Sequence, residues 1–402
     1  VPPAFSFGII ADVQYADRDD ALNFSGSRLR RYRTSKRLWE GAVQWFREEQ
    51  VDFIAQLGDF VDGCNRATAG HGHKALQDLL LPLEGGPPTL HLVGNHELYN
   101  FPRKEMEEGI ALPELSEPYR ISAPPVLDPE APSSTSSYYS FCPSHGWRVC
   151  VVDPYEISIM SGGGARPGID ADAELDSYAV ELCQANNPND ITKEDFARGI
   201  APGPDLRWVP LNGAVSQKQL QWLEDTLREA SDQKQRTILL SHVVLLPEAT
   251  PRGNGLTLLW NYDEVLDIIR RAADPPVAAM CGHAHLPVYA VDKVCGTHHI
   301  TLPSPLEVEP GSDACAVVLA HQNGDIEIKG VQCNATQQLN DSRSAHATMP
   351  VDSPVRVADG SQSLCVGRSE VRRVSSWLRA PVPGRGDIAS CRFSTDLQRR
   401  LV

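Results

Sequence analysis

The sequence lacks the features of three classes of protein. Its ten cysteines include no C-x-x-C pair, which argues against a disulfide scaffold and a thiolate zinc site. No stretch approaches the roughly 18 apolar residues of a membrane-spanning helix. The formal net charge of −15 opposes binding to nucleic acid or a membrane surface, because both attract basic proteins. We therefore expect reduced thiols in a cytoplasmic protein, with neither a membrane nor a nucleic acid as partner.

From the start of the chain we expect no signal peptide. A strand is predicted from Phe5, almost at the first residue, and Val1 in place of Met indicates a trimmed or fragmentary start. The length of 402 residues and a hydrophobic share of 41% suffice for one large domain or two ordinary ones.

The end of the chain has little that could form a core. Residues 331–402 are rich in Ser, Arg, Pro and Gly, with ten Arg against six acidic residues. Such a segment cannot bury enough apolar surface to offset the entropy lost on ordering. We therefore predict a folded domain at residues 1–330 and a disordered tail at 331–402. A short basic amphipathic turn at 371–378 that docks on the domain is the alternative.

Before that tail, apolar runs alternate with amphipathic segments, which is the pattern of β-α-β units. Strands are predicted at 5–11, 53–57, 89–93, 147–152, 237–240 and 277–280. A first helix, capped by Thr34 or Ser35, and further helices are predicted, the latter around 74–81, 217–230 and 262–273. Antiparallel strands are predicted at 288–293, 298–302, 316–321 and 325–329.

Residues 157–214 interrupt this alternation. The segment contains Gly162-Gly-Gly164 and several Asn and Pro residues, and it shows only short helical patterns. Long excursions beside the active edge of a sheet often shape a substrate pocket. We therefore interpret this segment as a substrate-shaping insertion.

Polar side chains follow the apolar strands where the strands end. The carboxyl ends of the strands form the edge at which ligands bind in open α/β sheets. Asp59 follows one strand, behind Gly58, which leaves room for backbone to approach a ligand closely. The other strand ends carry Asp12 and Gln14, Asn95 and His96, His242, and the pair His283 and His285.

These groups suit a metal centre that acts on phosphorus. They are carboxylates, amides and imidazoles, which are ligands for Mn, Fe, Zn or Co, and none is a thiolate. Two ions roughly 3.5–4 Å apart can share one carboxylate, an arrangement that promotes in-line displacement at phosphorus. Chance readily places one histidine at a strand end, but five donor-bearing strand ends in series are hard to explain that way.

The motifs resemble those of the calcineurin-like metallophosphoesterase superfamily. The motifs are Asp12-x-Gln14, Gly58-Asp-x-x-Asp62, Gly94-Asn-His-Glu97, His242 and Gly282-His-x-His285. Gln14 stands where the superfamily commonly has His. This variant, with Asn23-Phe24 and Leu259-Trp-Asn-Tyr262, is similar to the manganese-dependent ADP-ribose/CDP-alcohol diphosphatases.

The resemblance implies a four-layer α/β/β/α fold, in which helices flank two packed sheets with metals at the strand ends. One metal ion would take Asp12, Gln14, Asp59 and His285, and the other would take Asp59, Asn95, His242 and His283. His96 would protonate the leaving oxygen or stabilise the charge at phosphorus, oriented by Glu97. Asp62 would fix the orientation of a ligand.

The resemblance also implies two substrate contacts. Phe24 falls where the subfamily is expected to stack the nucleobase, and a Phe packed against the core is the alternative. Asn261 belongs to the motif at 259–262. Pro287, where the family often has glycine, and Thr257, where relatives have Cys, leave the substrate preference open.

The functional hypothesis is a monomeric, manganese-dependent hydrolase of nucleoside diphosphate-X compounds. A metal-bound hydroxide would convert ADP-ribose to AMP and ribose 5-phosphate, and CDP-alcohols such as CDP-choline to CMP and a phospho-alcohol. The partner would be this small-molecule substrate. A phosphodiesterase or phosphomonoesterase of the same superfamily is one alternative, and a catalytically silent scaffold of the same fold is another.

Overall fold

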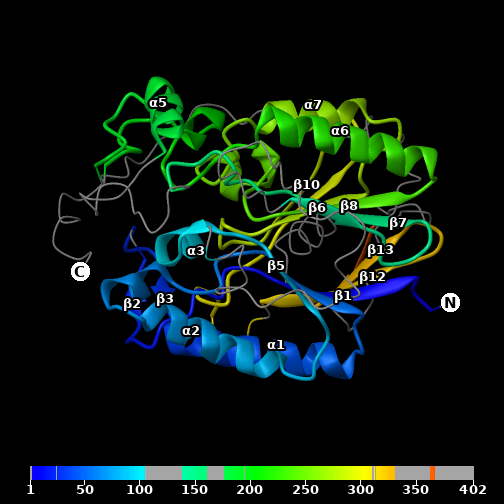
Figure 1. The fold of residues 1–402 in the computed structure, drawn as a ribbon, viewed down its shortest axis with the longest axis horizontal. Helices are drawn as coiled ribbons and strands as arrows, with labels where there is room; N and C mark the ends of the chain where they lie inside the picture. The colour runs from blue at the N-terminus through cyan, green and yellow to red at the C-terminus, as the bar shows by residue number, and fades with distance from the viewer. Residues whose placement is uncertain are drawn as a thin grey trace, which may run out of the picture.

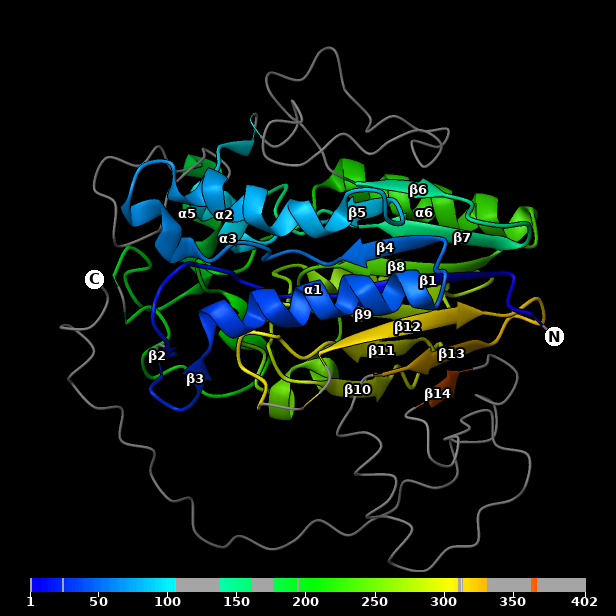
Figure 2. The same ribbon diagram turned by 90° about the horizontal axis from the view of Figure 1, so that it is seen from below.

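The computed structural model describes residues 2–160, 176–330 and 363–366, except for 24, 104, 106–137, 194, 310, 311 and 313. Two six-stranded sheets form its centre (Figures 1 and 2). The first has the order β14-β13-β12-β1-β4-β5 and the second the order β10-β11-β9-β8-β7-β6. Hydrophobic side chains from both sheets fill the space between them. The ring centroids of Phe53 and Phe141, one from each sheet, lie 5.5 Å apart there.

The strands of the first sheet come from both ends of the described chain. They are β1 (Phe5–Ile10), β4 (Phe53–Gln56), β5 (Thr89–His91), β12 (Cys315–Ala320), β13 (Ile326–Lys329) and β14 (Ser363–Val366). β1, β4 and β5 are parallel, whereas β12 is antiparallel to β1. The parallel strands therefore end at the same edge of the sheet.

The second sheet is built in the same way from the middle of the chain. Its strands are β6 (Tyr139–Phe141), β7 (Trp147–Val151), β8 (Arg236–Ser241), β9 (Ala278–Cys281), β10 (Val288–Val291) and β11 (His298–Thr301). β11 runs parallel to β9, and only β10 and β6 at the two edges are antiparallel to their neighbours. The predicted antiparallel pairing is confirmed for β10 with β11 and for β12 with β13. The two pairs lie in different sheets, however, and β11 also runs parallel to β9, which the sequence does not predict.

Helices cover the outer face of each sheet and complete the predicted four layers. α1 (Tyr32–Glu48) and α2 (His71–Leu80) lie on the first sheet, whereas α6 (Gln217–Asp232) and α7 (Tyr262–Arg271) lie on the second (Figure 1). α1 rests directly on β1, because a Cβ atom on Gly8 would come within 2.6 Å of the Phe46 ring. α3 (Asn95–Asn100) and α5 (Ser177–Asn186) lie near the ends of the parallel strands (Figure 1).

The start of α1 differs from the prediction. The helix begins at Tyr32 with Arg31 at the N-cap, so neither Thr34 nor Ser35 caps it. The backbone N–H of Arg31 donates to Leu306 O at 2.8 Å, and the Tyr32 side chain is buried. These tertiary contacts start the helix earlier than a capping side chain would.

The two segments assigned by composition are described only in part. Within 157–214 the structure has α5, whereas 161–175 lie outside the described residues. Within 331–402 it has β14, an antiparallel edge strand on β13 where the sequence predicts no strand (Figure 2). The rest of the tail, including 371–378, lies outside the described residues, so its disorder and the boundary at 330 stay predictions. No helix in the described part of the chain could cross a membrane.

Candidate active site

The predicted donors meet at one edge, where the parallel strands of both sheets end. Asp12 and Gln14 follow β1, Asp59 follows β4, Asn95 begins α3, His242 follows β8, and His283 and His285 follow β9. Ligand atoms of Asp59, His242 and His283 lie within 4.8 Å of one another, as do those of Asp12, Asp59 and His285. All five of these side chains are buried. Asp59 belongs to both groups, as the resemblance implies for a bridging carboxylate.

The backbone holds most of the donors in an uncommon conformation. Eight non-glycine residues of the described chain have positive φ, and five of them are Asp12, Gln14, Asp59, His283 and His285. Such conformations cost on the order of 1–3 kcal/mol each and persist only where the surrounding structure determines them. The donors are therefore positioned by the fold itself.

Backbone N–H groups orient the carboxylates. Asp12 accepts a hydrogen bond from His283 N at 2.9 Å, and Asp59 Oδ1 accepts one from His96 N at 2.8 Å. Gly94 leaves the space that Asp59 needs, since a Cβ atom there would come within 2.2 Å of Asp59 Oδ1. The amide of Gln14 donates to Asp59 Oδ2 at 2.8 Å and lies 2.9 Å from His285 Nε2.

Each imidazole of the centre directs one ring nitrogen toward a hydrogen-bond acceptor that lies outside the centre. His242 Nδ1 donates to Leu57 O at 2.7 Å, and His283 Nε2 donates to Asn212 Oδ1 at 2.9 Å. His285 Nδ1 lies 3.0 Å from a carboxylate oxygen of Glu307. With one nitrogen protonated in this way, the other carries the lone pair that a metal ligand needs.

The donor set fits divalent cations. His242 Nε2 lies 3.5 Å from Asp59 Oδ2, and neither His242 Nε2 nor Gln14 Oε1 has a hydrogen-bond partner in the described structure, although both are buried. Buried polar groups normally have partners, so such atoms need an explanation, and an ion is one. Oxygen and imidazole donors without thiolate suit Mn²⁺ or a similar ion.

Burial also shifts the ionisation of the centre. It raises the pKa of Asp12 to about 6 and that of Glu97 to about 7. Burial opposes the charge of Asp59 as well, but the imidazoles of His96 and His242 hold the pKa of that carboxyl below its usual value. Several buried carboxylates close together are costly unless cations compensate them, which is a further reason to expect metal ions here.

The contacts of His96 correct one expectation. Its Nδ1 accepts from Gly63 N at 2.8 Å and lies 3.5 Å from Asp62 Oδ2, so these two residues orient the ring. The expectation that Glu97 orients His96 is wrong, because consecutive side chains on α3 point in different directions. Glu97 instead accepts hydrogen bonds from the backbone N–H groups of Asp59, Phe60 and Gly94.

The two predicted substrate residues have different outcomes. Phe24 lies outside the described residues. In the sequence it falls between β2 (Ala21–Leu22) and β3 (Leu29–Arg30), two antiparallel strands that we call the β2–β3 hairpin. Asn261 is described, and its amide both donates to and accepts from the backbone of Val215 and donates to Glu264. These bonds tie the start of α7 to a neighbouring loop, and a substrate role for Asn261 stays a prediction.

Sequence reasoning missed three residues that support the donors. Glu307 and Asn212 hold His285 and His283, and the Tyr155 hydroxyl donates to Asn95 Oδ1 at 3.2 Å. None of the three belongs to a motif recognised in the sequence. Asp153, at the end of β7, binds the buried Arg103 at 2.7 Å and does not belong to the groups of donors.

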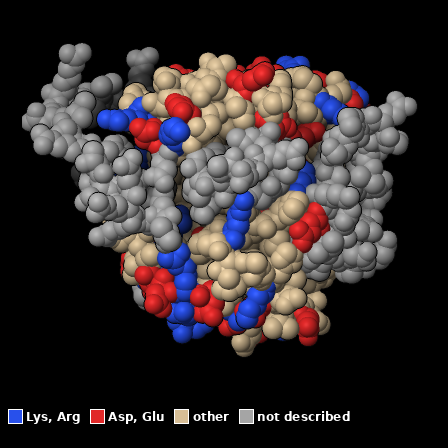
Figure 3. Space-filling model, turned by 60° about the vertical axis from the view of Figure 1, so that its left-hand side comes forward, with Lys and Arg blue, Asp and Glu red and all other residues tan. Residues whose placement is uncertain are grey.

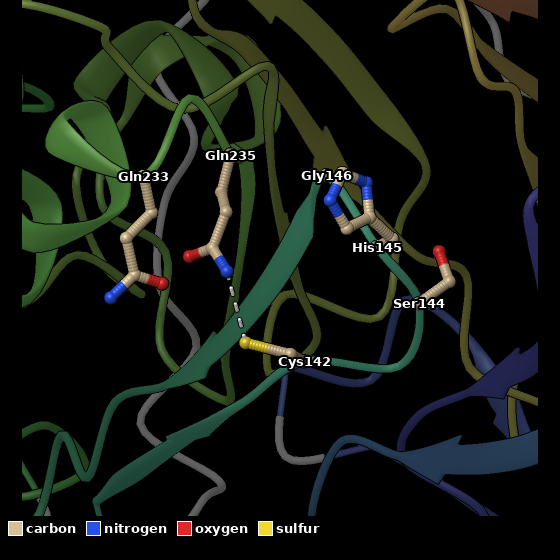
Figure 4. A pocket seen from close by; sticks show the side chains of 6 residues that line it. All are labelled: Cys142, Ser144, His145, Gly146, Gln233 and Gln235. Carbon is tan, nitrogen blue, oxygen red and sulfur yellow. Dashed lines mark hydrogen bonds between the residues drawn. The ribbon is translucent and has the colours of Figure 1, made fainter.

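A hollow elsewhere on the surface contains none of the predicted site residues. It is lined by Cys142, Ser144, His145, Gly146, Gln233 and Gln235 (Figure 4). The loop between β6 and β7 and the connection from α6 to β8 form it, at the end of the second sheet opposite the donors. The Cys142 thiol accepts a hydrogen bond from Gln235 Nε2 at 3.3 Å. The chemistry at the donor edge is therefore separate from this hollow.

Comparisons with known proteins agree with the geometry. Residues 5–287 match the calcineurin-like phosphoesterase family. A protein named manganese-dependent ADP-ribose/CDP-alcohol diphosphatase in Arabidopsis thaliana is 35% identical over 80% of this chain and 92% of its own. The protein of the same name in Homo sapiens is 31% identical over 78% of this chain and 86% of its own.

One solved structure is similar over most of the fold. The crystal structure of a dimetal phosphatase from Danio rerio covers 82% of this chain and 96% of its own, with a TM-score of 0.70 and 29% identity. The α/β/β/α arrangement predicted from the resemblance is thereby confirmed.

Proposed function

The chain belongs to the calcineurin-like phosphoesterase family, and from this premise we propose that it is a manganese-dependent ADP-ribose/CDP-alcohol diphosphatase. The observation that carries the proposal is the convergence of two groups of buried donors on the shared carboxylate of Asp59. Relatives named for this activity match most of the chain. The family match at residues 5–287 includes the segments that bear the donors. The proposed substrate is a small nucleoside diphosphate compound, ADP-ribose or a CDP-alcohol such as CDP-choline.

Seven residues would hold two ions: Asp12, Gln14, Asp59 and His285 for one, and Asp59, Asn95, His242 and His283 for the other. Bound Mn²⁺ would supply charge neutralisation at the phosphate oxygens and a water of lowered pKa. The fixed carboxylates and singly protonated imidazoles are what the protein contributes to that chemistry. Asp59 lies between the two groups, and its charge serves both.

His96 is the proposed proton donor to the leaving oxygen. Because its Nδ1 accepts from the backbone N–H of Gly63, the neutral ring carries its proton on Nε2. That nitrogen lies 3.9 Å from Asp59 Oδ2 and therefore faces the centre. Asp62, beside Nδ1, stabilises the ring when it is charged. A donor in this position assists cleavage when the ring is charged: the imidazolium gives its Nε2 proton to the departing oxygen and returns to the neutral ring.

Glu97 acts on geometry rather than on a proton. Its carboxylate joins the backbone at Asp59 and Phe60 to the start of α3, so the shared carboxylate and His96 keep a fixed spacing. We therefore describe Glu97 as a positioning residue. Phe24 and Asn261 remain the proposed substrate contacts, and residues 157–214 the proposed pocket-shaping insertion of a catalytic domain at 1–330.

We further propose a monomer that works in the cytoplasm without a nucleic acid or a membrane. The support for a reducing compartment is that six cysteines of the described chain form no disulfide: Cys64, Cys142, Cys150, Cys183, Cys281 and Cys295. A small-molecule substrate is also compatible with the surface at the hairpin end of the molecule. Basic and acidic side chains are mixed among the coloured atoms of that face (Figure 3).

A substrate panel tests the proposal. The protein is freed of metal with a chelator, reloaded with Mn²⁺, and assayed with ADP-ribose, CDP-choline, a cyclic nucleotide and p-nitrophenyl phosphate. We expect kcat/KM to be highest for the two diphosphates, with AMP and CMP as products. Highest activity on the cyclic nucleotide or the monoester would favour the other phosphoesterases. Inactivity on all four substrates with two ions bound would favour the silent scaffold.

A further inference from the structure

The turn at residues 304–309 joins three parts of the site. Ser304 N donates to His285 O at 3.2 Å, and Ser304 Oγ donates to Asp12 O at 2.7 Å. Arg31 N, where the β2–β3 hairpin leads into α1, donates to Leu306 O at 2.8 Å. One turn therefore touches the loop after β1, the loop after β9 and the end of the hairpin.

Glu307 connects the same parts through its side chain. Oε1 lies 3.0 Å from His285 Nδ1 and accepts from Arg30 Nε at 3.1 Å. Oε2 lies 2.9 Å from Arg28 Nη1. The Glu307 side chain is only 2% exposed, so water competes little for these contacts.

The contact with His285 affects the centre directly. A carboxylate that accepts from Nδ1 leaves the Nε2 lone pair facing inward, 3.6 Å from Asp12 Oδ1. Such carboxylate partners fix the tautomer and orientation of a metal-binding imidazole and raise its basicity. The contacts with Arg28 and Arg30 affect the hairpin, because Arg28 directly precedes β3 and Arg30 is the last residue of β3. Arg30 also lies 3.9 Å from Asp62 Oδ2, beside His96.

We propose that Glu307 is a positioning residue that sets the Mn²⁺ affinity of His285 and, through Arg28 and Arg30, holds the β2–β3 hairpin at the site. The inference deepens the proposed function and rests on it. One carboxylate thus serves metal binding and substrate binding at once. Loss of its charge weakens both, whereas loss of an arginine weakens only the hairpin.

The same turn offers a matched control. Glu309 accepts a hydrogen bond from Arg31 at 2.9 Å, so it too is a carboxylate paired with an arginine beside the hairpin. Its side chain is 78% exposed, and its ion pair in the described structure is with Arg31 alone. Glu309→Gln therefore removes the same charge from the same turn without touching an imidazole.

Metal binding is measured on the full chain without substrate. Metal-free protein is titrated with Mn²⁺ by calorimetry, and bound metal is counted by elemental analysis. Glu307→Gln is expected to weaken one of two Mn²⁺ sites by roughly 10- to 100-fold, the usual effect of losing such a partner. Glu309→Gln is expected to bind both ions as the wild type does. Equal Mn²⁺ binding by Glu307→Gln and the wild type would overturn the proposal.

Kinetics separate the two proposed roles of Glu307, toward His285 and toward the hairpin. Arg28→Gln is expected to keep both Mn²⁺ affinities and to raise KM for ADP-ribose several-fold, with kcat on p-nitrophenyl phosphate little changed. If Arg28→Gln changed the Mn²⁺ affinity as much as Glu307→Gln does, the proposed separation of the two roles would be overturned. Thermal unfolding of the metal-free variants checks folding. If Glu307→Gln does not fold, Glu307→Asp keeps the charge with a shorter reach, and its Mn²⁺ titration decides.

Failure of the proposed function and failure of the inference about Glu307 give different experimental results. A wild type that binds two Mn²⁺ ions but cleaves neither diphosphate contradicts that function, while weaker binding by Glu307→Gln still supports the role toward His285. A wild type that cleaves ADP-ribose, with a Glu307→Gln variant that binds Mn²⁺ normally, contradicts only the inference about Glu307.

Discussion

The two sheets contribute different chemistry to one centre. The first sheet supplies the donors that carry oxygen, and they follow its three parallel strands: Asp12, Gln14, Asp59 and Asn95. The second sheet supplies imidazoles alone, after two of its strands: His242, His283 and His285. Asp59 is the donor that belongs to both groups, so the two sheets meet at its carboxylate.

The supports of the two donor sets differ for a physical reason. A carboxylate is oriented by donors, and the backbone N–H groups of His283 and His96 serve Asp12 and Asp59. A neutral imidazole needs one nitrogen protonated and the other free, so it requires an acceptor. The acceptors are the Leu57 carbonyl, the Asn212 amide and the Glu307 carboxylate. The carboxylates of the first sheet therefore set the charge of the centre, and acceptors outside the strands of the second sheet set the tautomers of its imidazoles.

The strongest test of this contrast is to remove the shared charge. Asp59→Asn keeps the shape of the side chain but leaves a neutral amide between the two groups. We expect both metal sites to weaken and activity to fall by more than the roughly 10²–10⁴-fold of an acid–base group. Elemental analysis beside kinetics makes the measurement, with Asp17→Asn, an exposed carboxylate, as control. Full metal content in the Asp59 variant would remove its bridging role.

A second variant separates proton transfer from metal binding on the first-sheet side. His96→Ala should lower kcat by roughly 10²–10⁴-fold, because it removes the proposed proton donor while the seven proposed metal ligands remain. The two metal ions should stay bound, as elemental analysis can show. Loss of the ions in this variant would make His96 a ligand instead of a proton donor.

The contrast between the sheets also separates what the sequence could predict from what it could not. The donors follow apolar strands directly, so local runs and spacing alone suffice to place Asp12, Asp59 and His242 at strand ends. The predicted strands and the four layers are confirmed, whereas the edge strands β6 and β14 are not predicted. The parallel course of β11 is not predictable in this way, because pairing with β9 depends on contacts between distant segments.

The supports of the imidazoles are the part that sequence could not predict. Asn212 lies 71 residues before His283, and Tyr155 lies 60 residues after Asn95. Glu307 sits in a turn without a recognisable motif. The role of each residue is visible only in the folded chain, where it contacts either the imidazole nitrogen that faces away from the centre or the amide of Asn95. Residues adjacent in sequence can also mislead, as Glu97 beside His96 shows.

A third prediction concerns the nucleobase and again assigns a role to the first half of the chain. If Phe24 stacks on adenine or cytosine, it supplies about 1–3 kcal/mol, by analogy with base–aromatic stacking. Phe24→Ala should then raise KM for ADP-ribose and CDP-choline by roughly 5- to 150-fold. Hydrolysis of p-nitrophenyl phosphate, which has no base, should barely change. Equal losses on all three substrates would make Phe24 a core residue.

A fourth prediction concerns the weakest donor of the first sheet. An amide oxygen is neutral and binds more weakly than an imidazole, so Gln14 should soften its metal site and favour Mn²⁺ over Mg²⁺ in supporting activity. We expect a preference of at least about tenfold, which a difference of about 1.4 kcal/mol suffices to produce. Activity after chelation and reloading measures it. Equal activity with Mg²⁺ alone would contradict the manganese assignment.

The smallest effect is expected at the far edge of the first sheet. Deletion of residues 332–402 removes β14 and uncovers β13, while β1, β4 and β5, which carry the donors, lie beyond β12. The kcat should therefore stay within about twofold of wild type, and stability should fall slightly, since cross-strand pairs contribute roughly 0.2–1 kcal/mol each. An uncovered edge also promotes association between chains.

A shorter deletion controls for the strand itself. Removal of 367–402 leaves β14 in place, so its unfolding temperature and its tendency to associate should match those of the full chain. The difference between the two deletions then measures β14, because the turnover of both should be the same. A large loss of kcat in the longer deletion alone would mean that 332–366 reach the centre. The catalytic domain would then extend past residue 330, and the contrast between the two sheets would no longer account for the whole site.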